Sequence, residues 1–201
     1  MTAFHWKITR RLPVLAFAIC LCAGGARIPE PGIASALAAE KAVPAEKNPP
    51  GDIPDSQVFI DYSSPQGFSL KVPEGWARSD RADGASFIDK LDGVVVSVAK
   101  ADALPSIDTA KTEYVSKLEA NGRAVRVTAV KPVKLPAGPA IRIVYTSNSE
   151  PNAVTNRQVR LENERYLYFK DGKLVTLELY APKGADNVDQ WQLMSNSFQW
   201  K

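Results

Sequence analysis

Hydrophobic and polar positions alternate near the C-terminal end of the chain in two runs that predict a pair of strands. Both runs lie within Tyr166–Tyr180, on either side of Asp171-Gly172. Asp and Gly tolerate positive φ, so this pair favours a two-residue hairpin turn. A helix is expected from about Asp186 to Ser197, because three apolar side chains share one side of it: Val188, Trp191 and Met194. A hairpin does not bury its apolar face alone, so we expect this helix to cover it.

The same alternation recurs upstream and predicts an antiparallel sheet that the closing hairpin completes. The stretches with strand patterning are 58–62, 67–72, 85–89, 94–99, 123–133, 140–146 and 157–169. Within the last of them, Asn163 and its charged neighbours predict a bulge or a break. The polar segment Ser147–Thr155 is expected to be the most exposed loop.

One helix is predicted between the strands. Ser106 or Asp108 can cap its start, and Gly122 can end it in the left-handed conformation. Its core-facing stripe consists of Ile107, Ala110, Tyr114 and Leu118. The predicted fold class is therefore α+β, with an antiparallel sheet of about six to seven strands sandwiched by helices.

Residues 1–38 have the pattern of a signal peptide. A basic start with Lys7, Arg10 and Arg11 precedes an apolar run over 12–23, and Ala36-Leu37-Ala38 matches the A-x-A site of a signal peptidase. The apolar run is shorter than the roughly 20 residues that span a bilayer. We expect export to the periplasm or the extracellular space, by the general secretory or the twin-arginine route. An uncleaved anchor and an algal thylakoid lumen are the alternatives.

Cleavage after Ala38 changes the cysteine content and the charge. Cys20 and Cys22 are the only cysteines, and both lie in the leader, so the mature chain has no disulfide. The whole chain has 25 basic and 22 acidic residues; the leader contains four of the former and one of the latter, which leaves 21 of each. A net charge of zero argues against nucleic acid or an anionic lipid surface as a partner.

Residues 39–57 are rich in Ala, Glu, Lys and Pro and poor in large apolar side chains. This composition predicts an exposed, semi-stiff linker. The remaining residues, 58–201, suffice for a single domain.

The chemistry that the mature chain can perform is limited by its residue types. The only histidine is His5, in the leader, so a Ser-His-Asp triad and a zinc site built on imidazole or thiolate are excluded. Neither a P-loop nor a G-x-G-x-x-G motif is present. We therefore expect no catalytic residue, no cofactor and no metal.

Carboxylate chemistry is the remaining enzymatic option, because a glycosidase needs only two facing acidic residues. Asp80 with Asp83, or Asp89 with Asp92, are the candidates, although turn and surface roles explain them better, and neither turn has the spacing of a calcium loop. Two arginines beside Trp76 form a candidate partner-binding site, with a solvated turn as the alternative: Arg78 and Arg81.

Three stretches carry a resemblance to a known family: Tyr62-Ser-Ser-Pro-Gln-Gly-Phe-Ser-Leu-Lys-Val-Pro-Glu-Gly-Trp76, Val175-Thr-Leu-Glu-Leu, and Trp191 with Ser197-Phe198. From residue 58 to its end, the chain resembles the PsbP-like family, which implies an antiparallel sheet sandwiched by helices. Photosynthetic members are extrinsic subunits that help photosystem II to retain its ions, and bacterial members resemble envelope lipoproteins or chaperone-like adaptors. A eukaryotic relative binds a small GTPase. The histidines that photosystem members use are absent here, which puts that role in doubt.

The resemblance implies a non-catalytic helper that docks on a larger protein complex of the bacterial envelope. A small-ligand carrier is the first alternative, with a pocket between sheet and helix lined by Tyr114, Tyr145 or Trp191. A carboxylate-only hydrolase is the second. The membrane is expected as a partner only if the leader is retained.

Overall fold

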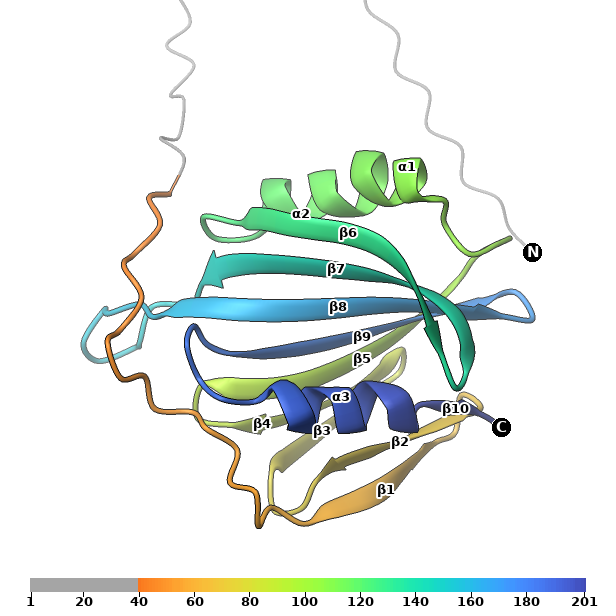
Figure 1. Ribbon diagram of the computed structural model, residues 1–201, viewed down its shortest axis with the longest axis horizontal. Coiled ribbons are helices and arrows are strands. Elements are labelled where there is room, and N and C mark those ends of the chain that lie inside the picture. Colours follow the sequence, from red (N-terminus) through yellow and green to blue (C-terminus); the bar gives the residue numbers. More distant parts are fainter. Residues whose placement is uncertain (1–39) are drawn as a thin grey trace, which may run out of the picture. The chain divides into compact units, whose positions relative to one another are not determined.

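The computed structural model describes residues 40–201, so the predicted signal peptide, with His5, Cys20 and Cys22, lies outside the described residues. Seven antiparallel strands form one sheet in the order β3-β4-β5-β9-β8-β7-β6 (Figure 1). These strands are β3 (Ala77–Arg81), β4 (Gly84–Asp89), β5 (Asp92–Lys100), β6 (Arg126–Leu135), β7 (Gly138–Asn148), β8 (Arg160–Lys170) and β9 (Lys173–Pro182). The α+β fold class and the strand number predicted from the sequence are confirmed.

The predicted hairpin is the centre of this sheet. Strands β8 and β9 pair in unbroken register up to Lys170 and Lys173. The two turn residues both have positive φ, 49° at Asp171 and 75° at Gly172. A turn of this kind matches the right-handed twist of the flanking strands, which explains why the Asp-Gly pair fixes the hairpin.

One face of the sheet is covered by a second, smaller sheet together with the closing helix. The small sheet has the order β1 (Phe59–Ser64), β2 (Phe68–Pro73) and β10 (Gln199–Trp200), and the helix is α3 (Val188–Ser197). Phe198 stacks on Tyr168, with ring centroids 4.2 Å apart, and thereby joins the two layers. The first two strands therefore do not extend the main sheet. Met194 of α3 is buried as predicted, but Val188 is 71% exposed.

A helical layer covers part of the opposite face (Figure 1). It consists of α1 (Ile107–Thr109), the π-helical stretch η1 (Ala110–Val115) and α2 (Ser116–Asn121). Ser106 caps its start, as predicted, by accepting a hydrogen bond from the backbone N–H of Thr109. Gly122 ends it in an extended conformation, with φ −90°, so the predicted left-handed stop is wrong. A side chain at Gly122 would collide with the carbonyl of Leu118, which explains the glycine there.

Two local predictions are corrected in the sheet. Asn163 causes no bulge: it lies in regular register between Tyr145 on β7 and Tyr180 on β9. Its amide donates a hydrogen bond to the Ser147 hydroxyl, at 3.0 Å, which compensates for its burial. Among the strands of residues 40–201, the register shifts instead in β6, between Val127 and Ala129. The loop predicted as most exposed begins with residues that are buried, at positions 147–149, and is exposed at Glu150 and from 152 to 157.

The segment 40–57 has no regular secondary structure, but it is not a free linker. In Figure 1 its orange trace runs along the domain to the start of β1. Ile53 is only 4% exposed, and its backbone N–H donates to the Asn187 side chain at 2.6 Å. The expectation of a solvated linker is therefore corrected at these contacts. Its composition did not reveal the buried isoleucine or the hydrogen bonds that attach it.

Candidate functional site

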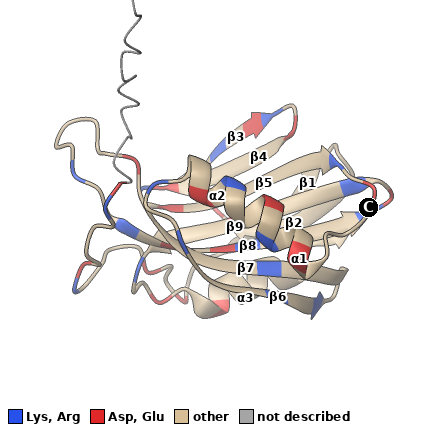
Figure 2. Cartoon of the chain, turned by 90° about the horizontal axis from the view of Figure 1, so that it is seen from above, with Lys and Arg blue, Asp and Glu red and all other residues tan. Residues whose placement is uncertain are grey.

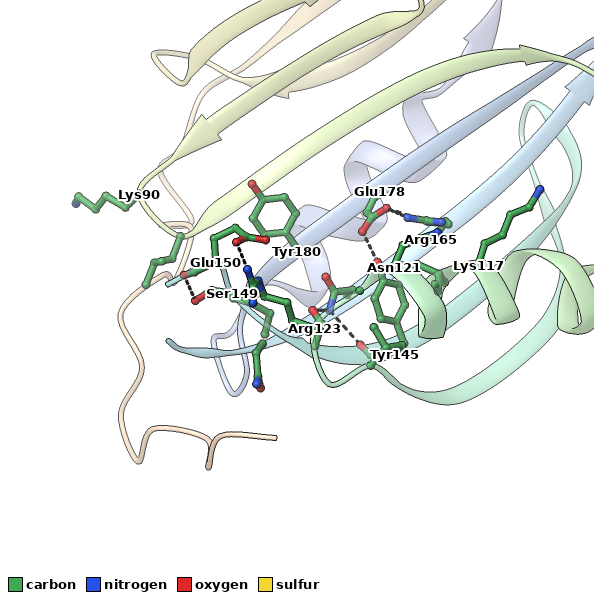
Figure 3. Close-up of a pocket in the computed structure, with 18 residues that line it drawn as sticks. Lys90, Lys117, Asn121, Arg123, Tyr145, Ser149, Glu150, Arg165, Glu178 and Tyr180 are labelled. Carbon is green, nitrogen blue, oxygen red and sulfur yellow. Dashed lines mark hydrogen bonds and ion pairs between the residues drawn. The ribbon is translucent and has the colours of Figure 1, made fainter. Parts of the chain in front are cut away.

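A cavity of about 620 Å³ opens between α2 and the main sheet. Its floor consists of side chains from the adjacent strands β7, β8 and β9, and its walls come from α2, the loop after β7 and the turn between β4 and β5 (Figure 3). The floor lies on the face that the helical layer covers in part. The cavity exists because α2 ends at Asn121 and leaves the adjacent end of strands β7–β9 without a cover.

Three side chains on adjacent strands form the polar network of the floor. Tyr145 on β7 donates its hydroxyl to one carboxylate oxygen of Glu178 on β9. Arg165 on β8 donates to the other oxygen, with its Nε at 2.9 Å. Strand register places Arg165 directly opposite Glu178, so the ion pair needs no unusual backbone geometry.

Burial and charge set the protonation of this network. Burial raises the pKa of the Tyr145 phenol, and the Glu178 carboxylate beside it raises that pKa further. Burial lowers the pKa of Arg165, but the charges of Glu178 and Tyr145 and the hydrogen bonds to both together outweigh it, so the pKa of Arg165 is raised. At neutral pH the floor therefore holds a neutral phenol and a mutually neutralised ion pair.

The remaining floor residues are also held in place. Asn163 is fixed by Ser147, as described above, and the Tyr180 ring packs over Gly93 on β5, where any side chain would collide with it. Burial, followed by the charges of Glu178 and Asp92, raises the pKa of Tyr180. The floor thus presents rigid, uncharged polar groups flanking the ion pair.

The cavity rim carries an excess of positive charge. Arg123 pairs with Glu150, with Nη2 at 2.8 Å from the carboxylate. Lys90 and Lys117 lie at opposite ends of the opening (Figure 3) and form no ion pair with any residue in 40–201. The two carboxylates of the lining, Glu150 and Glu178, are each ion-paired with an arginine. The two lysines therefore give the lining a net positive charge.

The candidate partner-binding residues Arg78 and Arg81 lie elsewhere, on the edge strand β3. The alternative of a solvated turn is corrected, because both arginines belong to a regular strand, and all five of its residues are exposed. Each arginine pairs with an acidic residue of its own segment: Arg78 with Asp80 at 2.9 Å and Arg81 with Asp83 at 3.7 Å. Figure 2 shows both signs of charge side by side on β3. Such a charged edge is typical of strands that avoid pairing with other chains.

The acidic candidates do not converge on the cavity. Asp80 and Asp83 are engaged by the arginines of β3, and Asp89 and Asp92 close the β4–β5 hairpin opposite each other. Asp92 is 5% exposed, and its Oδ1 has no hydrogen-bond partner among the described residues. Burial, with the charges of Asp89 and Asp52, raises the pKa of Asp92 to about 7. Residues 40–201 contain no cluster of three acidic, His or Cys side chains that suits a metal ion.

The aromatic residues named for a ligand pocket have separate roles. Tyr145 lines the cavity, whereas Tyr114 lies in the helical layer beside Lys117, whose Nζ is 6.0 Å from the ring centroid. Trp191, on α3, packs into the core between this helix and the sheets. No helix within 40–201 has the length and hydrophobicity to cross a membrane.

Comparisons with known proteins address the fold. Neither a family model nor a curated protein sequence matches the chain. Among solved structures, PsbP of the cyanobacterium Synechocystis sp. PCC 6803 is 15% identical with a TM-score of 0.52, and the match covers 75% of this chain and 98% of that one. The Ran-binding protein Mog1p of Saccharomyces cerevisiae is 10% identical with a TM-score of 0.49, covering 72% and 96%. LpqN of Mycobacterium tuberculosis, involved in cell envelope biogenesis, is 11% identical with a TM-score of 0.45, covering 71% and 89%.

The likeness to cyanobacterial PsbP extends over almost the whole of that protein and shows that this chain has the PsbP-like fold. The fold predicted from the residues of β1, β2, β9 and α3 is thereby confirmed. An identity of 15% defines the fold and not the function. The function therefore has to be argued from the cavity.

Proposed function

We propose that the protein is an exported, non-catalytic binding protein of the bacterial envelope, which docks on a larger protein assembly. The cavity between α2 and the sheet is its contact site. The signal-peptide pattern of residues 1–38 supports export. A mature chain with equal numbers of basic and acidic residues supports local recognition of a partner over general attraction to an anionic surface.

The observation that carries this proposal is the network of Tyr145, Arg165 and Glu178 on the cavity floor, in which the carboxylate already has a partner at each oxygen. Both carboxylate oxygens of Glu178 accept hydrogen bonds from Tyr145 and Arg165. A general base needs a side chain that is free to take up a proton from the substrate, most often a histidine or a carboxylate. Glu178 is poorly suited to that task, because both of its oxygens already accept hydrogen bonds and it is ion-paired with Arg165. The floor is therefore suited to holding a fixed shape.

The rim supplies the groups that recognise a partner. Lys117 and Asn121 on α2 and Lys90 on the β4–β5 turn surround the opening. The side chain of each can donate hydrogen bonds to a partner. A partner surface with carboxylates or exposed carbonyls complements such donors. The contact is thus expected to weaken as the salt concentration rises.

Two lysines of the helical layer provide a matched test. Lys117 lines the cavity, whereas Lys111 is exposed and does not. The immobilised mature chain is incubated with envelope extract, and the captured proteins of the wild type, Lys117→Glu and Lys111→Glu are compared by mass spectrometry. We expect one set of proteins to be lost with Lys117→Glu and retained with Lys111→Glu. Turnover of glycans or esters by the purified protein, with no such difference in capture, would refute the proposal.

A small-ligand carrier is the second candidate function. The volume of the cavity, about 620 Å³, favours it, since small-molecule sites occupy roughly 300–1,000 Å³. Native mass spectrometry of the protein purified from its host distinguishes the two functions. A carrier retains a small molecule that Lys117→Glu releases, whereas a docking module shows the mass of the polypeptide alone.

A further inference from the structure

The beginning of the described chain binds to the folded domain beside the cavity. The carboxylate of Glu40 accepts three hydrogen bonds, from Arg123 Nη1 at 3.0 Å, Asn148 Nδ2 at 2.9 Å and Gln158 Nε2 at 2.6 Å. These three residues, which we call the rim socket, come from the loop after α2, the end of β7 and the loop before β8. All three groups are donors, so the rim socket is specific for an acceptor, and its guanidinium favours a carboxylate.

The rim socket also binds the peptide backbone. The Asn148 side chain donates to the carbonyl of Lys41 at 2.9 Å and accepts from the N–H of Val43 at 3.1 Å. One amide side chain thus satisfies a carbonyl and an N–H two residues apart, as a neighbouring strand would. This contact recognises an extended backbone and is independent of its side chains.

Asn148 is held in this orientation by the domain itself. It is 4% exposed, and its oxygen also accepts a hydrogen bond from Arg160 Nη1 at 2.9 Å. Arg160 is in turn bound to the carbonyl of Ala124 at 2.9 Å. The amide is therefore fixed by groups that do not depend on the N-terminal segment, and a fixed amide loses little entropy when it binds.

The N-terminal segment also borders a second hollow that adjoins the cavity. This hollow is lined by Glu46 of the segment and shares four residues with the first cavity: Lys90, Leu91, Ser149 and Glu150. The segment therefore lies next to the residues that the two hollows share.

We propose that the rim socket is a recognition site for an extended peptide that carries a carboxylate side chain. The chain's own Glu40–Val43 occupies it in the free protein, and an acidic segment of the docking partner replaces it in the complex. This inference rests on the proposed docking function and names the chemistry of the partner. The resident segment acts as a competitor, whose attachment to the domain gives it a high effective concentration.

The test uses a peptide with the sequence of residues 39–47, acetylated at its N-terminus and fluorescently labelled at its C-terminal lysine. Its binding to the mature wild type, Glu40→Lys and the control Glu46→Lys is measured by fluorescence anisotropy. Glu40→Lys places an ammonium beside Arg123 and releases the resident segment, whereas Glu46 makes no hydrogen bond or ion pair with other described residues. Thermal unfolding verifies that each variant is folded.

We expect the peptide to bind Glu40→Lys at least about ten times more tightly than the wild type or Glu46→Lys, because competition from the resident segment is lost. A peptide with Gln at the Glu40 position should bind at least about ten times more weakly, and adding Gln158→Ala to Glu40→Lys should weaken binding severalfold. Equal binding of the Glu and Gln peptides, or no binding to folded Glu40→Lys, would overturn the inference. Either result leaves the docking proposal to be decided separately by capture with Lys117→Glu.

Discussion

Tyr145 and Glu178 are bound to each other across an intervening strand: the phenol on β7 donates to the carboxylate on β9, and β8 runs between them. Arg165 on β8 donates a hydrogen bond to the other oxygen of the same carboxylate. Three adjacent strands, β7, β8 and β9, are thus joined through side chains at the point where the helical layer ends. The shape of the cavity floor depends on this contact.

Glu178→Gln tests how much the floor network stabilises the protein. The side chains of Glu178 and Arg165 are 19% and 22% exposed, so loss of the carboxylate leaves a largely buried guanidinium without its counter-charge. We expect the free energy of unfolding to fall by about 1–3 kcal/mol, measured by urea denaturation. Glu119→Gln, on the exposed side of α2, is the control and should change stability by less than about 0.5 kcal/mol. Equal stability of the two variants would show that the network contributes nothing.

The buried carboxyl of Asp92 should give the stability of the protein an unusual pH dependence. Its pKa is about 7 in the folded protein and near 3.9 in an unfolded chain. Between these values the folded state binds more protons than the unfolded state, so stability should fall as the pH rises from about 4 to about 7 and then level off. Asp92→Asn removes this fall and should be more stable than the wild type at pH 8 by about 1–4 kcal/mol.

Urea denaturation at a series of pH values measures this effect. Asp89→Asn is the informative comparison, because Asp89 is exposed and only adds to the raised pKa of Asp92. It should reduce the fall in stability without abolishing it. If Asp92→Asn showed the same pH profile as the wild type, the buried carboxyl would not be its source.

Ile53→Ala tests whether the segment before β1 belongs to the folded domain. Ile53 is 4% exposed within the main core, so its truncation should lower the free energy of unfolding by about 2–4 kcal/mol. Ile60→Ala is the matched control, since Ile60 on β1 is 45% exposed and should cost less than about 1 kcal/mol. A segment that behaves as a free linker would give the opposite order.

Much of the sheet followed from the sequence, because the alternation of apolar residues and the Asp171-Gly172 turn are local signals. That turn also fixes the register of β8 and β9, so the pairing of Arg165 with Glu178 was readable from the residues, although it was not predicted. Position Asn163 was misread as a break because its partner, Ser147, lies on another strand. Tyr145 reaches Glu178 only through a register set after a long loop, which no local pattern reveals.

The edges of the domain were harder to predict for a physical reason. β3 consists only of exposed polar and charged residues and alanine, so it has no apolar alternation and was interpreted as a turn. The segment 40–57 is fixed by Ile53 and by backbone hydrogen bonds to Asn148 and Asn187. Such contacts depend on where distant residues fold, and composition alone does not record them.

Site-specific photo-crosslinking in the intact envelope tests the central claim most directly. A photoreactive residue is placed at Asn121, which lines the cavity, or at Lys111, which lies on the exposed side of the helical layer. If the cavity is the docking site, position 121 gives a discrete adduct with one partner protein and position 111 gives none. Adducts of equal yield from both positions, or an adduct from position 111 alone, would contradict the account.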